Sequence, residues 1–285
     1  MLWGFFPVYF SWLKPASALE IVAERVVWCF VFLLLVLLVQ RNWSWVVPTL
    51  RDRRRLTLIA LSAAFITTNW LTYNWAVNHH QAVEGSLGYF INPLVTVVIG
   101  VVALRETLRR AQWVAVGVAT VAVVILTVDT GRLPWIALVL AGTFATYGVI
   151  MKFVRTPPVE ALTMGMGVMF VPFLLVLVVL QARGSLVLSH GTPRESALLI
   201  GAGVVTAVPM LFFNAAAPKV KLSTMGLLQY INPVLQFLLS VTVLHETLSA
   251  GRWAGFALVW VALVILGIDG LRHSRRPAQL DVAAV

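Results

Sequence analysis

The sequence has few charged residues. Asp, Glu, Lys and Arg make up 11% of its 285 residues, 60% are hydrophobic, and the mean hydropathy is +0.91. Soluble domains carry roughly 25% charged residues, so this chain has too little charge to cover a surface in water. The composition predicts an integral membrane protein whose outer surface lies against a lipid bilayer.

Cysteine is almost absent too. Cys29 is the only cysteine, which excludes an internal disulfide and a metal cluster built on cysteines. The net charge of +10 could indicate a nucleic-acid partner, but the basic residues stand between long apolar runs, without RNP-like aromatics or zinc-finger spacing. We therefore expect no nucleic-acid partner, no metal and no cofactor.

The motifs of membrane enzymes are also lacking. The sequence contains no HExxH, GxSxG, Walker A or aspartate-rich motif. Its few carboxylates do not cluster as a catalytic pair. We predict that the protein is not an enzyme and has no catalytic residues.

Long apolar runs dominate the chain instead. A helix that crosses a bilayer needs about 20 mainly apolar residues. Residues 1–13 are apolar but too short, and we expect them to be the second half of a truncated first helix that begins upstream of Met1. Runs of spanning length cover residues 18–39, 56–78, 83–104, 111–128, 133–151, 159–181, 196–217, 222–244 and 252–270. The predicted fold is all-α, with about ten transmembrane helices.

Basic residues divide unevenly between the two sides of these helices, and short loops rich in Lys and Arg stay in the cytoplasm. The poorer side has Lys14, Arg132, Arg183, Arg194 and Arg252. The richer side has Arg41, Arg51, Arg53, Arg54, Arg55, Arg105, Arg109, Arg110, Lys152, Arg155, Lys219, Lys221, Arg272, Arg275 and Arg276. We predict a multi-pass protein of the cell (cytoplasmic) membrane with both termini in the cytoplasm.

The sequence repeats itself at an offset of 140 residues. YFINPL at 89–94 aligns with QYINPV at 229–234, and VAVVILTVD at 121–129 with VALVILGID at 261–269. Each half would hold an odd number of helices, and positions 105, 109 and 110 lose their arginines in the second half. Both features predict two inverted five-helix repeats, as in many secondary transporters. The repeats cover residues 1–131 and 132–270, followed by a cytoplasmic tail, 271–285.

Polar residues lie on matching faces in the two repeats. Tyr89 and Asn92 share a helical face in the first repeat, and Gln229, Asn232 and Gln236 share one in the second. Polar groups inside a membrane tend to face a cavity, so these stripes are candidates for a solute pathway. Contacts that hold helices together are the alternative, because amides also mediate helix packing in membranes.

Trp70, Asn74 and Asn78 form a second candidate face. An aromatic ring with two amides suits a polar organic ligand, although hydrogen bonds to a neighbouring helix explain the amides equally well. Pro93 and Pro233 each remove a helical hydrogen bond and are candidates for equivalent hinges in the two repeats.

Charged residues occur inside the predicted span 18–39. Glu20 and Glu24 share a face, and Arg25 lies beside them. We interpret Glu24 and Arg25 as part of the pathway, where a carboxylate could carry a coupling proton or pair with a cationic solute. Snorkelling to the interface is the alternative, mainly for Glu20.

The sequence resembles the EamA family of the drug/metabolite transporter superfamily, and within it the RarD group. NWLTYNWAVNHHQAVEGSLGYFINPL at 69–94, RRAQWVAV at 109–116 and LSTMGLLQYINPVLQFLLSV at 222–241 carry the resemblance, and EIVAERVVW at 20–28 agrees more loosely. It implies ten helices in two inverted repeats, a central pathway, and solute movement without ATP. Members of the family are linked with the export of metabolites or drugs.

We therefore predict a secondary transporter that exports a small polar metabolite or drug-like solute by alternating access. A passive channel is the alternative, since paired Asn-Pro motifs in an inverted repeat occur in aquaporins. In those channels a small alanine follows the motif at the tip of a half-helix. Here the bulky Leu94 and Val234 follow it inside spans of full length.

The predicted topology can be tested with reporter fusions. Reporters placed after Arg155 and at the C-terminus should read as cytoplasmic, and one placed after Arg132 as external, because of the distribution of basic residues. Activity of paired cytoplasmic and periplasmic reporters measures this. A cytoplasmic signal after Arg132 would contradict the ten-helix topology.

Overall fold

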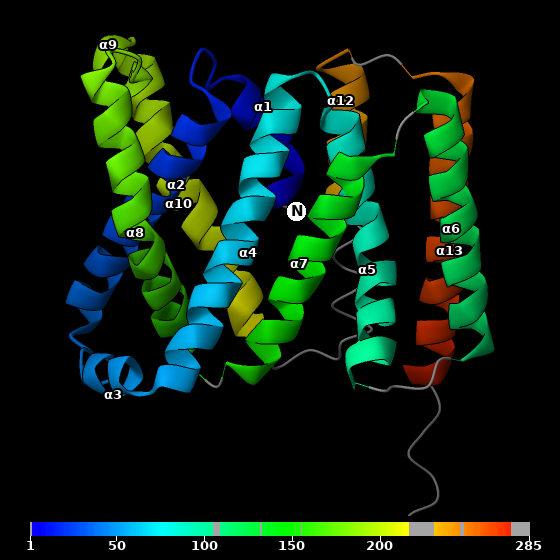
Figure 1. Cartoon of the computed structure of the whole chain (residues 1–285), viewed down its shortest axis with the longest axis horizontal. Coiled ribbons are helices and arrows are strands. Elements are labelled where there is room, and N and C mark those ends of the chain that lie inside the picture. Colours follow the sequence, from blue (N-terminus) through cyan, green and yellow to red (C-terminus); the bar gives the residue numbers. More distant parts are fainter. Residues whose placement is uncertain are drawn as a thin grey trace, which may run out of the picture.

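The computed structural model describes residues 2–104, 109–131, 133–154, 156–216, 231–245 and 248–274. Regular structure in these residues is entirely helical, and the long helices stand side by side in Figure 1. They are α2 (Ala18–Gln40), α4 (Arg53–Asn78), α5 (Ala82–Leu104), α6 (Arg110–Thr130), α7 (Trp135–Phe153), α8 (Pro158–Ala182), α10 (Pro193–Ala216), α12 (Ile231–Thr242) and α13 (Ala250–Ser274). The short ones are η1 (Leu2–Phe5), α1 (Phe6–Ser11), α3 (Val46–Arg51) and α9 (Val187–His190).

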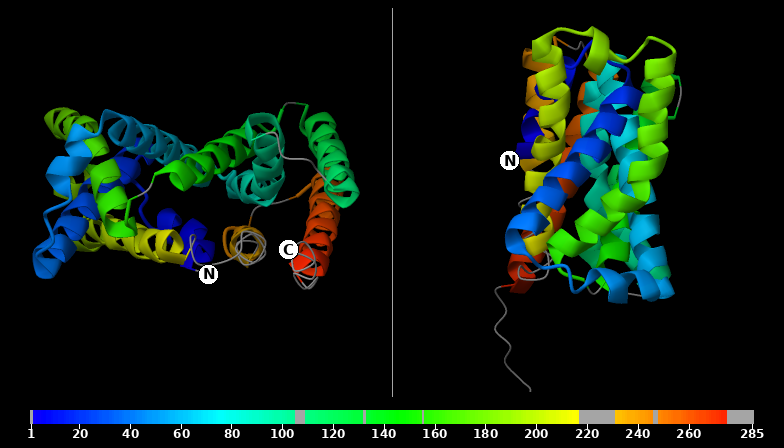
Figure 2. Two further views of the ribbon diagram at one scale, coloured as in Figure 1. Left: turned by 90° about the horizontal axis from the view of Figure 1, so that it is seen from below. Right: turned by 90° about the vertical axis from the view of Figure 1, so that its left-hand side faces the viewer.

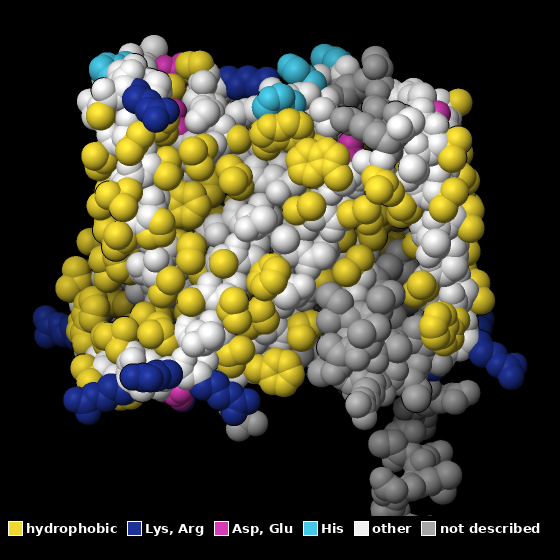
Figure 3. All heavy atoms as spheres, viewed as in Figure 1, with side chains coloured by type: hydrophobic (Ala, Val, Ile, Leu, Met, Phe, Trp, Pro, Cys, Tyr) yellow, Lys and Arg dark blue, Asp and Glu magenta, His cyan; other side chains and the backbone are white. Residues whose placement is uncertain are grey.

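The outer surface is apolar between its two ends. Figure 3 shows apolar side chains over the middle of the face in view, with Lys and Arg near the upper and lower edges. Val39 is 85% exposed and Phe212 is 68% exposed. Within the described residues, five helices are long and apolar enough to cross a membrane: Ala18–Gln40, Arg53–Asn78, Pro158–Ala182, Pro193–Ala215 and Trp253–Arg272. The chain is a multi-pass membrane protein, and its described part is all-helical.

Local sequence signals fix the ends of the helices. The Ser17 hydroxyl accepts a hydrogen bond from the backbone N–H of Glu20 and caps α2, and Asp52 caps α4 by accepting from the N–H of Arg55. Arg41 ends α2 in the left-handed conformation, with φ of 52°.

The helices predicted from hydropathy begin and end within a few residues of the observed ones. Residues 222–230 of the predicted span 222–244 lie outside the described residues, and α12 covers Ile231–Thr242 of that span. The apolar run 1–13 forms η1 and α1. The sequence did not predict α3 and α9, because each is shorter than any membrane span and lies in a connection.

Six of the helices form two rows. One row contains α4, α7 and α5, and the other contains α10, η1 and α12, as the left view of Figure 2 shows. Helix α2 packs against α8 and α10 at one end of the molecule, and α6 packs against α13 at the other. The space between the rows, near η1, holds the candidate site.

Two polar ties join α6 and α13. Asp129, near the end of α6, accepts a hydrogen bond from the Ser249 hydroxyl just before α13. Asp269, near the end of α13, pairs with Arg109 just before α6, with Nη2 and Oδ2 2.7 Å apart. Positions 129 and 269, like 109 and 249, differ by the offset of the sequence repeat. Each end of the helix pair is therefore tied by equivalent positions.

Helices α2 and α10 approach each other closely at Gly203. A Cβ added to this glycine would clash with the carbonyl carbon of Trp28 and would lie 2.6 Å from the backbone nitrogen of Cys29. Backbone atoms cannot move aside as a flexible side chain can. Only glycine allows this approach, which follows the use of small residues at helix interfaces in membranes.

We predict that Gly203→Ala destabilises the protein by about 1–3 kcal/mol, because the added methyl group overpacks the contact. Thermal or denaturant unfolding of the purified protein in detergent measures the loss. Gly117→Ala in α6 is the matched control, since a Cβ there meets nothing within 4 Å. Equal stability of the two variants would contradict the close contact.

Candidate functional site

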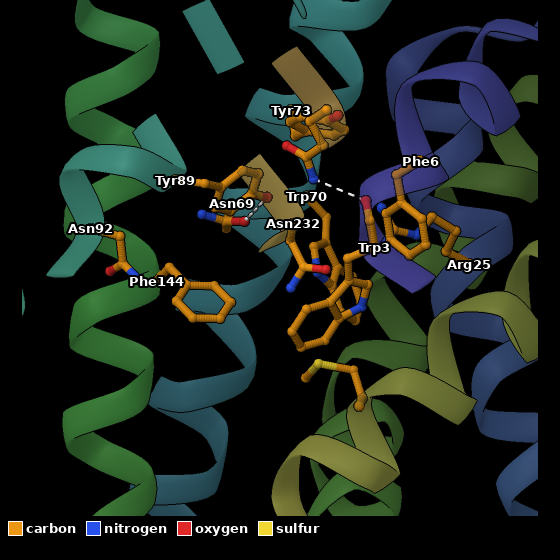
Figure 4. Close-up of a pocket in the computed structure, with 12 residues that line it drawn as sticks. Trp3, Phe6, Arg25, Asn69, Trp70, Tyr73, Tyr89, Asn92, Phe144 and Asn232 are labelled. Atoms are coloured by element: carbon orange, nitrogen blue, oxygen red, sulfur yellow. Dashed lines mark hydrogen bonds between the residues drawn. The ribbon is translucent and has the colours of Figure 1, made fainter. Parts of the chain in front are cut away.

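A pocket opens between the two helical rows. It holds about 600 Å³ of space between protein atoms, including the part open to solvent, and Figure 4 shows the side chains around it. Aromatic rings form much of its wall, and one arginine and several amides supply its polar groups. The lining residues are Trp3, Phe6, Arg25, Asn69, Trp70, Tyr73, Tyr89, Asn92, Phe144, Met210, Asn232 and Gln236.

Arg25 is the one charged residue in this lining, and it is only 1% exposed. Its Nε donates a hydrogen bond of 2.9 Å to the Thr206 hydroxyl on α10. Its guanidinium carbon lies 4.4 Å from the ring centroid of Trp70 and 4.7 Å from that of Phe10. Cation–π attraction to these two rings therefore stabilises the guanidinium charge.

Part of the guanidinium is left without a partner. The buried Nη1 of Arg25 has no hydrogen-bond partner among the described residues. The ion pairs found in that part of the chain join other residues, Arg55 to Asp52 and Arg109 to Asp269. Among the described residues, the pocket wall therefore contains a buried cation and no carboxylate that pairs with it.

Helix α12 brings two amides, Asn232 and Gln236, to the pocket. Gln236 is 2% exposed, and its Nε2 donates a hydrogen bond of 2.9 Å to the backbone carbonyl of Trp3. The carbonyl oxygens Oε1 of Gln236 and Oδ1 of Asn232 have no partner among the described residues. Both oxygens are buried hydrogen-bond acceptors on residues that line the pocket.

Tyr89 and Asn69 form a fixed polar pair. The Tyr89 hydroxyl donates to Oδ1 of Asn69 over 2.9 Å, and Nδ2 of Asn69 donates to the Leu140 carbonyl and the Thr143 hydroxyl. This network joins α4, α5 and α7. It holds the Tyr89 ring on the pocket wall, where Asn92 of the same helix also lies.

Glu24 lies off the pocket, although it is the neighbour of Arg25 in sequence. Its Oε2 accepts a hydrogen bond of 2.6 Å from the Trp28 indole of the same helix, and its Oε1 has no partner among the described residues. Glu20 accepts hydrogen bonds from the backbone N–H groups of Val187 and Leu188, so it anchors the start of α9. The structure thus separates both carboxylates from the guanidinium.

Asn74 and Asn78 also lie outside the pocket lining. Asn74 donates to the Trp70 carbonyl of its own helix, and Asn78 donates to the Ala16 carbonyl in the connection before α2. Of the face predicted on this helix, Trp70 alone lines the pocket. Neither contact is a hydrogen bond to a neighbouring helix, because Asn74 bonds its own helix and Asn78 bonds the connection before α2.

Of the remaining predicted site residues, the structure describes the two prolines but not Gln229. Pro93 lies within α5 and Pro233 within α12. Gln229 lies outside the described residues. Across the described part of the chain, no group of three His, Cys, Asp or Glu side chains could hold a metal ion.

Sequence reasoning missed much of the aromatic wall. Trp3 and Phe6 come from the short first run, and Phe144 from α7. Trp3 packs edge-on against Phe144, with ring centroids 6.3 Å apart. In an apolar span a pocket aromatic has the same composition signal as one that faces lipid, so no pattern in the sequence distinguished them.

Known proteins match this chain over nearly its whole length. The sequence pattern of the EamA-like transporter family matches residues 1–128 and again 133–268. A protein named Protein RarD from Streptomyces exfoliatus is 50% identical over 99% of this chain and 90% of its own length. Protein RarD of Escherichia coli K12 is 40% identical over 98% and 94%.

Two further matches extend this result. An uncharacterized transporter of Vibrio cholerae is 38% identical over 98% of this chain and 93% of its own length. A protein of known crystal structure is 17% identical and superimposes with a TM-score of 0.63 over 95% of both chains, which shows a shared fold alone. The resemblance expected from the sequence motifs is confirmed: the chain belongs to the EamA-like transporter family.

Proposed function

We propose that the protein is a secondary transporter that moves a small polar solute through the pocket between its two halves, without ATP. One observation carries this proposal: Asn92 of α5 and Asn232 of α12, which occupy equivalent positions of the sequence repeat, line the same pocket. Secondary transporters built from inverted repeats bind solute where the repeats meet. The family and its relatives named as transporters favour the same function.

Residues 1–131 and 132–270 form the two repeats in this proposal. Three helix pairs related by the offset, α2 with α8, α5 with α12 and α6 with α13, pack against each other. The reciprocal ties of Asp129 to Ser249 and of Asp269 to Arg109 exchange equivalent positions. In each contact an aspartate of one repeat bonds a residue of the other repeat, and the second contact is the first with the two repeats interchanged. A two-fold relation between the repeats produces this pattern, so the contacts support the proposed repeat.

The orientation follows the basic residues. Helices α2 and α4 meet at the lower edge of Figure 1, where Arg41, Arg51 and Arg53 lie in sequence at their ends. Figure 3 shows more Lys and Arg side chains along this edge than along the upper one. Under the positive-inside rule this edge faces the cytoplasm, and we propose that α13 ends on this side of a bacterial cytoplasmic membrane. The described chain begins about halfway between the two edges in Figure 1, so a cytoplasmic N-terminus stays a prediction.

Alternating access requires the pocket to open to each side in turn. Pro93 in α5 and Pro233 in α12 each remove one backbone hydrogen bond from their helix, at equivalent positions beside Asn92 and Asn232. We assign these prolines as hinges at which the two central helices bend. Export of the solute is the direction that the family resemblance favours.

Flux through purified protein in liposomes tests the proposal. A carrier gives saturable uptake for at least one solute of a metabolite panel, whereas flux that rises linearly with concentration would indicate a channel instead. We expect Asn232→Leu and Gln236→Leu to lower the flux roughly two- to tenfold, because each removes a hydrogen-bonding group worth about 0.5–1.5 kcal/mol. Membrane insertion should stay normal. Lower yield with unchanged flux per molecule would assign these amides to packing.

Accessibility of α12 to water gives a test that needs no solute. In a Cys29→Ala background, single cysteines at positions 232 and 236 should react with a water-soluble thiol reagent. Cysteines at 234 and 238 should stay unreactive, because Val234 and Leu238 are 40% and 48% exposed on the apolar exterior. Mass spectrometry after labelling in membranes measures the difference. Equal inertness at all four positions would contradict a pathway along α12.

A further inference from the structure

We infer that the pocket binds its solute through a carboxylate group, which pairs with Arg25, so that the transported molecule is a small organic monoanion. This inference rests on the proposed transport function and names the substrate class of the same site. It follows from a charge that the described part of the protein leaves unneutralised inside a membrane.

The first step concerns the cost of the charge. A cation near the centre of a transmembrane helix costs about 2.5–3.5 kcal/mol on insertion scales and is usually paired or directed at a polar cavity. Arg25 lies inside α2, is 1% exposed, and lines the pocket with Nη1 unpartnered among the described residues. The lining residues that the structure describes include no Asp or Glu. A bound anion is the group that would complete this site.

The second step concerns the orientation of the guanidinium. Thr206 accepts from Nε, and the rings of Trp70, Phe10 and Phe6 lie 4.4, 4.7 and 5.6 Å from the guanidinium carbon. These contacts fix the group, and its buried Nη1 keeps no hydrogen-bond partner among the described residues. An arginine held in this way is preorganised for a carboxylate, whose two oxygens match the N–H donors of the guanidinium.

The third step concerns the rest of the solute. Figure 4 shows Phe6 and Trp3 between Arg25 and Asn232, and Phe144 on the other side of Asn232. These rings suit a planar or apolar body. Oδ1 of Asn232 and Oε1 of Gln236 are buried acceptors without a partner among the described residues, and in this inference they accept hydrogen bonds from a hydroxyl or amino group of the solute. A single guanidinium neutralises one negative charge, so a monocarboxylate fits better than a phosphate dianion.

Binding of 4-hydroxybenzoate to the purified full-length protein in nanodiscs tests this inference. The probe has one carboxylate, a planar ring and a hydroxyl donor, and 4-hydroxybenzamide is its neutral counterpart. Hydrogen bonds to a charged group contribute about 1.5–3 kcal/mol, so we expect the acid to bind at least tenfold more tightly than the amide. Calorimetry or displacement of labelled acid measures both affinities. Equal affinities, or no binding of the acid, would overturn the inference.

Variants locate the preference at Arg25. We expect Arg25→Gln to abolish the preference for the acid while binding of the amide is retained, and Thr206→Val to reduce the preference severalfold. Arg54→Gln, which removes an exposed arginine, is the control with the same loss of charge and should leave the preference intact. A preference that survives Arg25→Gln would overturn the inference. If that variant does not fold, the comparison of acid with amide in the unaltered protein decides.

These outcomes are distinct from failure of the transport function. Saturable flux of neutral solutes together with equal binding of acid and amide would contradict the carboxylate site and still support the transport function. Conversely, preferential binding of the acid with inert cysteines at positions 232 and 236 would keep the anion site and contradict the proposed pathway.

Discussion

The close contact between α2 and α10 is the constraint on which the candidate site depends. Gly203 allows the backbones of the two helices to approach, and Thr206, on the same helix, then reaches the Nε of Arg25. Without that hydrogen bond the arginine would lose its only polar contact found among the described residues. The packing of two apolar helices thus determines where a positive charge stands inside the membrane.

The aromatic residues have a second role in this arrangement. The rings of Trp70 and Phe10 face the guanidinium, so they offset part of its desolvation cost when no anion is present. Other rings extend the same apolar wall from α7 and from the start of the chain. The pocket therefore combines one strong electrostatic feature with a surface that makes few geometric demands on a solute.

Some of this could be predicted from the sequence. Hydropathy gives the helices because each span must satisfy its backbone within itself, and the period of polar residues placed Tyr89, Asn92, Asn232 and Gln236 on shared faces. The sequence pattern did not show which polar side chains form contacts with other parts of the chain. Asn78 bonds the Ala16 carbonyl, a contact that depends on the three-dimensional path of the chain. The aromatic wall likewise arises only when α7 and η1 meet.

The unneutralised arginine also bears on what the pathway must keep out. A membrane carrier that exposes its pocket to both sides in turn risks leaking protons and small metal cations down their gradients. A fixed positive charge in a constriction raises the electrostatic barrier for such ions, as arginine does in water-conducting pores. With Arg25 buried in the wall, an empty pocket repels the cations that maintain the membrane potential. The low permeability to cations would then be a property of the pocket even when no solute is bound.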